Sequence, residues 1–85
     1  MDAGVTAKPV PDRTLDIIAL FDPVDCRGLR VIKRELADME MSQLLEVMSN
    51  PFQEREIRAW VKRFPHEIIA TDVEGDRRHV YIRRG

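Results

Sequence analysis

The chain has very little cysteine: Cys26 is the only one among its 85 residues. A single cysteine excludes an internal disulfide and a Cys-rich metal site, and it suits a reducing cytoplasm. His66 and His79 lack the spacing of metal ligands, so no metal site is expected. No apolar run approaches the ~20 residues of a membrane span, and the first residues lack the apolar segment of a signal peptide. No phosphate-binding loop or Ser/His/Asp set is present. We therefore expect a cytoplasmic protein that does not bind in a membrane.

The chain is also short and nearly neutral, with a formal net charge of −1. A chain of this length forms one domain that buries roughly 60% of its unfolded surface, which leaves no room for a deep active-site cavity. We expect its function to lie at the surface or to use a partner. Two clusters are basic: Arg27, Arg30, Lys33 and Arg34, and Arg77, Arg78, Arg83 and Arg84. They are either solvated faces or a patch for an anionic partner, but a nucleic-acid-binding domain would be more basic.

The segment 22–39 predicts an amphipathic helix. Asp22 suits the N-cap, Pro23 suits the first helical position, and Asp25 complements the positive end of the helix dipole. An apolar stripe follows at steps of three and four: Leu29, Ile32, Leu36 and Met39. Gly28 interrupts this pattern at a cost of up to about 1 kcal/mol relative to alanine. It marks either the true start of the helix or a place where another backbone comes close.

The remaining pattern predicts four strands and a second helix. The strands are expected over 14–21, 43–48, 66–73 and 79–83. The second helix is expected over 51–64, with Asn50 as N-cap, Gln53 completing a capping box and Pro65 ending the helix. A turn at 74–76 joins the last two strands into a hairpin.

The element order is therefore β-α-β-α-β-β. Two helices with one apolar stripe each can cover only one face of a sheet. This predicts an α+β fold, a two-layer α/β sandwich in which two helices pack on one face of a four-stranded mixed sheet. The domain is expected over 14–85, after a flexible leader at 1–13 in which Pro9 and Pro11 block regular structure.

Several runs of residues follow one family pattern in order. They are LD at 15–16, LEV at 45–47, NP at 50–51, EIRAWVKR at 56–63, HEII at 66–69 and VYIRR at 80–84. In this combination the chain resembles the TusA/SirA-like family of small sulfur-carrier proteins over roughly residues 14–84. The resemblance implies the fold above, no metal or organic cofactor, and two protein partners. One partner is a sulfur donor of the desulfurase or rhodanese type, and the other is a sulfur acceptor.

The chain departs from this family where the family has its chemistry, a Cys-Pro-x-Pro motif at the start of the first helix. Counting forward from the first strand places the motif cysteine on Asp22 and the two prolines on Pro23 and Asp25. Counting backward from Met39 places the motif cysteine on Asp25. The two counts differ by three residues, so the resemblance implies a helix head lengthened by nearly one turn, and neither count places Cys26 on the motif cysteine.

One interpretation makes Cys26 the sulfur carrier. A thiolate is the nucleophile that accepts sulfur, and a helix N-terminus lowers a thiol pKa. Arg27 and Arg30 act in the same direction, whereas the two aspartates of the helix head oppose them. Partner docking would use Arg27, Arg30 and Arg34.

The other interpretation makes the chain a thiol-independent interaction or regulatory module. Cys26 lies three residues before Leu29, so on a continuous helix it joins the buried stripe as a small hydrophobe. Asp22 and Pro23 then stand where the family has Cys-Pro. The sequence leaves both interpretations open, and with them the question of whether the protein is an enzyme.

Overall fold

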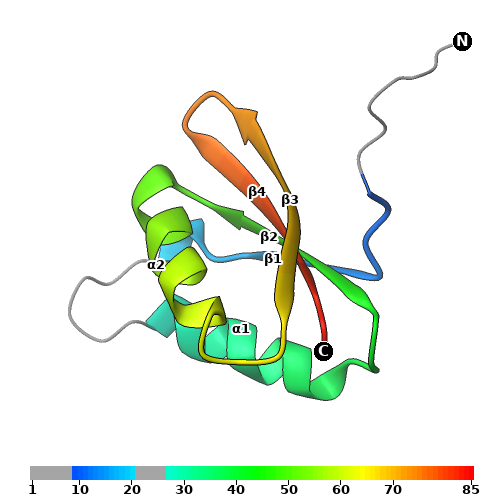
Figure 1. Ribbon diagram of the computed structural model, residues 1–85. Coiled ribbons are helices and arrows are strands. Elements are labelled where there is room, and N and C mark those ends of the chain that lie inside the picture. Colours follow the sequence, from blue (N-terminus) through cyan, green and yellow to red (C-terminus); the bar gives the residue numbers. More distant parts are fainter. Residues whose placement is uncertain (1–8, 21–26) are drawn as a thin grey trace, which may run out of the picture.

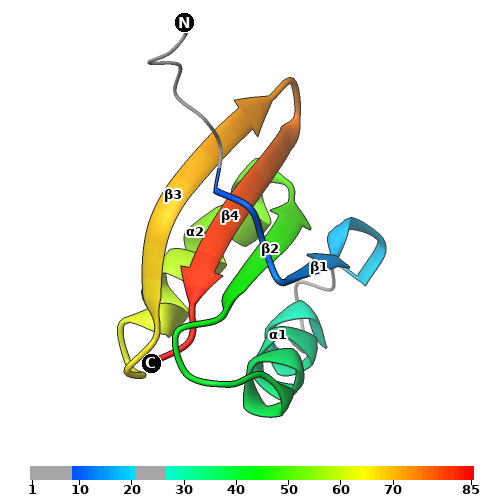
Figure 2. The ribbon, with the colours of Figure 1, turned by 90° about the vertical axis from the view of Figure 1, so that its right-hand side faces the viewer.

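The computed structural model describes residues 9–20 and 27–85. Its elements are β1 (Arg13–Asp16), a 3-10 helix η1 (Ile18–Leu20), α1 (Arg27–Asp38), β2 (Leu44–Ser49), α2 (Pro51–Val61), β3 (Glu67–Glu74) and β4 (Arg77–Arg83). The strands form one sheet in the order β1-β2-β4-β3 (Figure 1). β1 is parallel to β2, and β4 is antiparallel to both of its neighbours. The two helices lie on one face of this mixed sheet (Figure 2), so the predicted two-layer α+β fold is confirmed.

The hydrophobic core lies between the helices and the sheet. In β2, Leu45 and Val47 alternate with less buried residues, as expected for a strand with one covered face. The helices contribute the stripes that their spacing predicts. The fully buried members of the core cluster are Ile17, Ile32, Leu36, Leu45, Val47, Ile57, Val80 and Ile82. Trp60 is only partly buried and packs against this cluster.

Within the described residues, two element boundaries differ from the sequence prediction by more than two residues. The expected start of the first helix, at residue 22, lies outside them. The first strand was expected to reach residue 21 but ends at Asp16, because the carboxylate of Asp16 accepts a hydrogen bond from the backbone N–H of Ile18 (2.9 Å) and turns the chain into η1. The second helix was expected to reach residue 64 but ends at Val61, and a turn follows it. The other strands lie within two residues of the expected ranges.

The predicted capping box at the start of α2 is confirmed. The side chain of Asn50 accepts a hydrogen bond from the backbone N–H of Gln53 (2.7 Å). In return, the backbone N–H of Asn50 donates to Oε1 of Gln53 (2.9 Å), and Pro51 occupies the first turn. These bonds satisfy two N–H groups that a helix terminus otherwise leaves without partners.

Gly28 lies in the first turn of α1, where Ile17 packs closely against the helix. A Cβ atom at Gly28 would lie 3.2 Å from Cδ1 of Ile17, which is tighter than an ordinary contact. Of the two roles that the sequence leaves open, this supports close approach, although the neighbour is a side chain rather than a backbone.

The segment before β1 crosses the helix-free face of the sheet. In Figure 2, residues 9–12 pass in front of β4 and β2. Asp12 then joins the sheet margin, because its N–H donates to the carbonyl of Leu44 and its carboxylate accepts from the N–H of Leu44 (both 2.8 Å). Most of the expected leader, residues 1–8, lies outside the described residues, and Arg13 is already the first residue of β1.

Candidate functional site

The residues predicted to carry the chemistry fall in one stretch of the chain. Cys26 and the motif-equivalent positions Asp22, Pro23 and Asp25 all lie outside the described residues. The structure describes the chain on both sides of this stretch, because η1 ends at Leu20 and α1 begins at residue 27.

The connection from β1 to α1 leaves the sheet at a defined edge. β1 and β2 are parallel, with Leu15 opposite Val47, so their carboxyl ends meet at the same edge. α2 also begins at this edge, directly after β2, with Asn50 as its N-cap. In open α/β sheets, ligands bind outside the carboxyl ends of the strands. The stretch that contains Cys26 therefore connects two elements at the edge where such sites form.

Ile17 ties both helix starts to this edge. Its side chain packs against Gly28 of α1, and its carbonyl accepts a hydrogen bond from Nε2 of Gln53 of α2 (2.8 Å). Ile17 is 1% exposed and Gln53 is 4% exposed. The capping pattern predicts the bonds between Gln53 and Asn50, but no sequence signal predicts the bond to Ile17, because the two residues are 36 positions apart.

The predicted docking residues lie on α1. Arg27 is its first residue, and Arg30 and Arg34 are exposed one turn apart. Within residues 9–20 and 27–85, neither Arg30 nor Arg34 forms an ion pair. Lys33, between them, has its Nζ atom 5.9 Å from the centre of the Phe64 ring, which is the distance of a cation–π contact.

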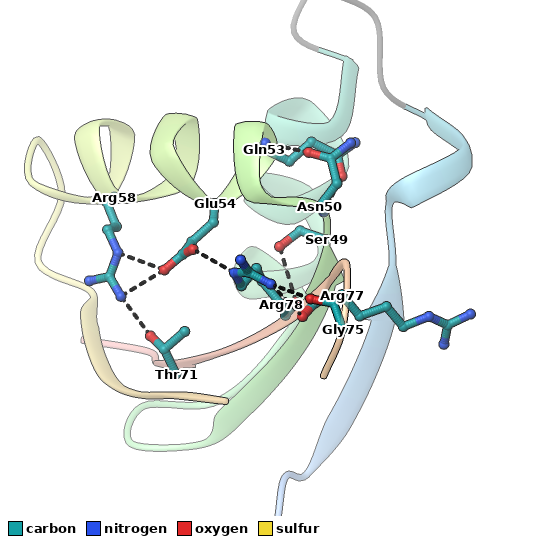
Figure 3. A network of polar contacts seen from close by, with 9 residues as sticks. All are labelled: Ser49, Asn50, Gln53, Glu54, Arg58, Thr71, Gly75, Arg77 and Arg78. Atoms are coloured by element: carbon teal, nitrogen blue, oxygen red, sulfur yellow. Dashed lines mark hydrogen bonds and ion pairs between the residues drawn. The ribbon is translucent and has the colours of Figure 1, made fainter. Parts of the chain in front are cut away.

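A polar network fastens α2 to the β3–β4 hairpin (Figure 3). Glu54 accepts a hydrogen bond from Nε of Arg58 (2.9 Å) and forms an ion pair with Arg78 (3.5 Å). Arg58 also donates to the hydroxyl of Thr71 (2.8 Å), and the hydroxyl of Ser49 donates to the carbonyl of Arg78 (3.2 Å). The i,i+4 spacing in α2 predicts the first contact, whereas the others depend on the fold. Because Glu54 forms an ion pair with both arginines, the network holds α2 against the hairpin.

A second polar group lies on the helix-free face of the sheet. Nδ1 of His79 lies 2.6 Å from Oε2 of Glu46, and Nε2 lies 2.9 Å from Oε1 of Glu74. The hydroxyl of Tyr81 donates to Glu46 (3.4 Å). Both ring nitrogens of His79 therefore face carboxylate oxygens, an arrangement that favours the protonated form of the ring. His79 thereby links β4 to β2 and β3.

These contacts explain why the pKa of His79 is raised above 6.5. The hydrogen bond to Glu74 is the largest cause, and Glu46 adds to it against the opposing effect of burial. His66 shows the reverse: burial, and then the charge of Arg84, lower its pKa. Its Nδ1 atom accepts a hydrogen bond from the N–H of Gly85 (3.2 Å), as a neutral ring can. In the described part of the chain, no group of three or more His, Cys, Asp or Glu residues is placed to hold a metal ion.

The contacts of His79 predict a pH dependence of folding stability. Because its pKa is higher in the folded than in the unfolded state, its contribution is fully present below pH 6.5 and is lost as the pH rises through the folded value. We expect His79→Gln to lower the urea midpoint at acidic pH and to lower it less as the pH rises. His66→Gln serves as the control. Because the pKa of His66 is lowered in the folded state, the contribution of His66 to folding stability changes with pH only below about pH 6.5, outside the range in which that of His79 changes. A His79→Gln deficit that is the same at acidic and alkaline pH would contradict this assignment.

Comparison with known proteins adds no family assignment. No protein-family model matches the chain, and no curated protein matches it either. Neither helix within residues 9–20 and 27–85 has the length and apolar character needed to cross a bilayer.

Proposed function

We propose that the protein is a divergent TusA/SirA-like sulfur carrier of the cytoplasm, and that the Sγ atom of Cys26 holds the transferred sulfur. The observation that carries this proposal is the position of the β1–α1 connection. That connection contains the chain's only thiol and leaves the sheet at the carboxyl edge, where both helices begin. The confirmed element order and the mixed sheet agree with the fold that the family resemblance implies.

The proposed reaction is a transfer of sulfane sulfur between cysteines. The Cys26 thiolate attacks the terminal sulfur of a protein persulfide, R–S–SH. A new S–S bond forms on Cys26, the donor's S–S bond breaks, and the donor leaves as the thiolate R–S⁻. The product, Cys26–S–SH, passes its terminal sulfur to an acceptor thiol by the same step. No redox partner, metal or organic cofactor enters this balance.

Docking supplies the specificity in this proposal. The donor is a desulfurase- or rhodanese-type protein, and it approaches over the exposed side of α1 that carries Arg30 and Arg34, with Arg27 at the start of the helix. These cations also favour the thiolate form of a neighbouring cysteine. A reducing cytoplasm keeps a lone thiol available for this chemistry.

Intact mass spectrometry tests the proposal. After incubation with a persulfide donor and removal of that donor, we expect the folded protein to gain the mass of one sulfur atom. Cys26→Ala is expected to gain nothing, because the chain has no other cysteine. An unchanged mass of the wild-type protein would support the other interpretation, a thiol-independent module with Asp22 and Pro23 at the motif positions.

A further inference from the structure

Charge is unevenly divided between the two layers of the fold. The segment 27–38, which is α1, and the segment 51–63, which is α2 with the two turn residues after it, contain eight Lys and Arg against four Asp and Glu, whereas the rest of the chain contains six against eleven. The formal net charge of −1 therefore combines a basic helix layer with an acidic remainder. Such a division gives the helix layer a positive local electrostatic potential, which the net charge of the whole chain does not reveal.

Six of the eight cations of the helix layer are exposed and form no ion pair within the described residues. We call them the helix-layer basic surface: Arg30, Lys33 and Arg34 of α1, with Arg55, Lys62 and Arg63 in or directly after α2. Among the described residues, no ion pair involves any of the six. Some arginines elsewhere differ in this respect, because Arg13 pairs with Glu35 and Arg83 pairs with Glu67. An exposed cation without an acidic neighbour remains available to an external anion.

The two helices present these cations as one surface. The i, i+3, i+4 spacing puts Arg30, Lys33 and Arg34 on one side of α1. Lys33 reaches across to the ring of Phe64, the residue that follows Arg63. Phe64 in turn lies 4.7 Å from Trp60, measured between ring centroids, and both rings are only partly buried. The surface thus includes two partly exposed aromatic rings with Lys33 beside them, and aromatic residues and arginines are enriched in protein interfaces.

We propose that the helix-layer basic surface docks an acidic segment of a partner protein. Charge complementarity supports an anionic occupant, and the partly exposed rings of Trp60 and Phe64 supply an apolar contact for it. A protein segment fits better than a nucleic acid, because a polynucleotide extending beyond the helix layer would meet the acidic remainder of the chain. This surface includes the side of α1 on which the proposed sulfur donor docks, but peptide binding does not need Cys26 and is therefore tested separately from sulfur transfer.

Fluorescence anisotropy with a labelled oligoglutamate peptide tests the proposal on the full chain. We expect the peptide to bind at low salt and to dissociate as the salt concentration rises. Arg30→Glu and Arg63→Glu should each weaken binding by about two- to fivefold or more, as expected for the loss of an exposed ion pair. Arg77→Glu is the matched control: it reverses the charge of an arginine on the hairpin that is also exposed, and it should leave the affinity unchanged.

Circular dichroism of each variant confirms that it is folded, and testing two positions keeps the experiment informative if one variant does not fold. The proposal is overturned if oligoglutamate does not bind, or if Arg77→Glu weakens binding as much as the helix variants do. Tighter binding of a single-stranded oligonucleotide than of oligoglutamate would overturn it in favour of a nucleic acid. Cys26→Ala should bind like the wild type, which separates this result from the sulfur-loading result.

Discussion

Replacing Ile57 by alanine is expected to lower the free energy of unfolding by about 3 kcal/mol. Ile57 is 0% exposed and belongs to the cluster between α2 and the sheet. Truncation removes three carbon atoms from this cluster, so the variant loses their burial energy and leaves a cavity that the neighbours fill only in part. Urea unfolding followed by circular dichroism gives the difference.

Two other variants make this prediction specific. Ile57→Val removes a single methylene and is expected to cost about 1 kcal/mol. Ile69→Ala removes the same atoms as Ile57→Ala, but Ile69 is 43% exposed and lies at the irregularity in the pairing of β3 with β4. Its expected cost is below about 1 kcal/mol. If Ile69→Ala cost as much as Ile57→Ala, the core would not lie where the structure has it.

Replacing Gln53 by leucine is expected to cost about 3 kcal/mol, although leucine is apolar and similar in size. Gln53 is 4% exposed, and its side chain donates to the carbonyl of Ile17 and accepts from the N–H of Asn50. Leucine can do neither, so a carbonyl and an N–H lose their partners in a place that water reaches poorly. A loss below about 0.5 kcal/mol would show that this link between α2 and the β1–α1 connection is dispensable.

Gln53→Glu separates the two hydrogen bonds of this side chain. At neutral pH a carboxylate still accepts from Asn50 but cannot donate to Ile17. Burial raises the pKa of a carboxyl group, and the protonated form regains a donor. We therefore expect the loss of unfolding free energy in Gln53→Glu, relative to the wild type, to shrink as the pH falls. The loss in Gln53→Leu should not shrink in this way, because leucine has no group that titrates. Parallel urea titrations at several pH values distinguish the two variants.

The sequence predicts the fold well where a local pattern decides the structure. The apolar stripes of the helices, the capping box at Asn50 and the turn before β4 are all local, and each is confirmed. The end of β1 is not predicted from apolar content, because Ile17 and Ile18 continue a strand-like run beyond it. There the hydrogen bond from Ile18 to the side chain of Asp16 competes with the strand, and the local turn prevails.

The contacts around the candidate site depend more on the fold than on spacing. The link from Gln53 to Ile17 and the bridge from His79 to Glu46 join residues more than thirty positions apart. A single sequence does not predict such contacts between distant residues before the strand order is known. By contrast, the basic side of α1 is readable from the i, i+4 spacing of Arg30 and Arg34, and both are exposed.

Sulfur carriage by the folded protein is tested most directly by comparing sulfur loading of the folded chain with that of the same chain unfolded in urea. The two samples are exposed to one persulfide donor, weighed intact, and digested to locate any added sulfur. We expect the folded chain to gain one sulfur atom on the peptide containing Cys26, a reductant to remove it, and Cys26→Ala to gain none. Loading of the unfolded chain without loading of the folded chain would show that the fold shields the thiol, and this result would contradict the sulfur-carrier function.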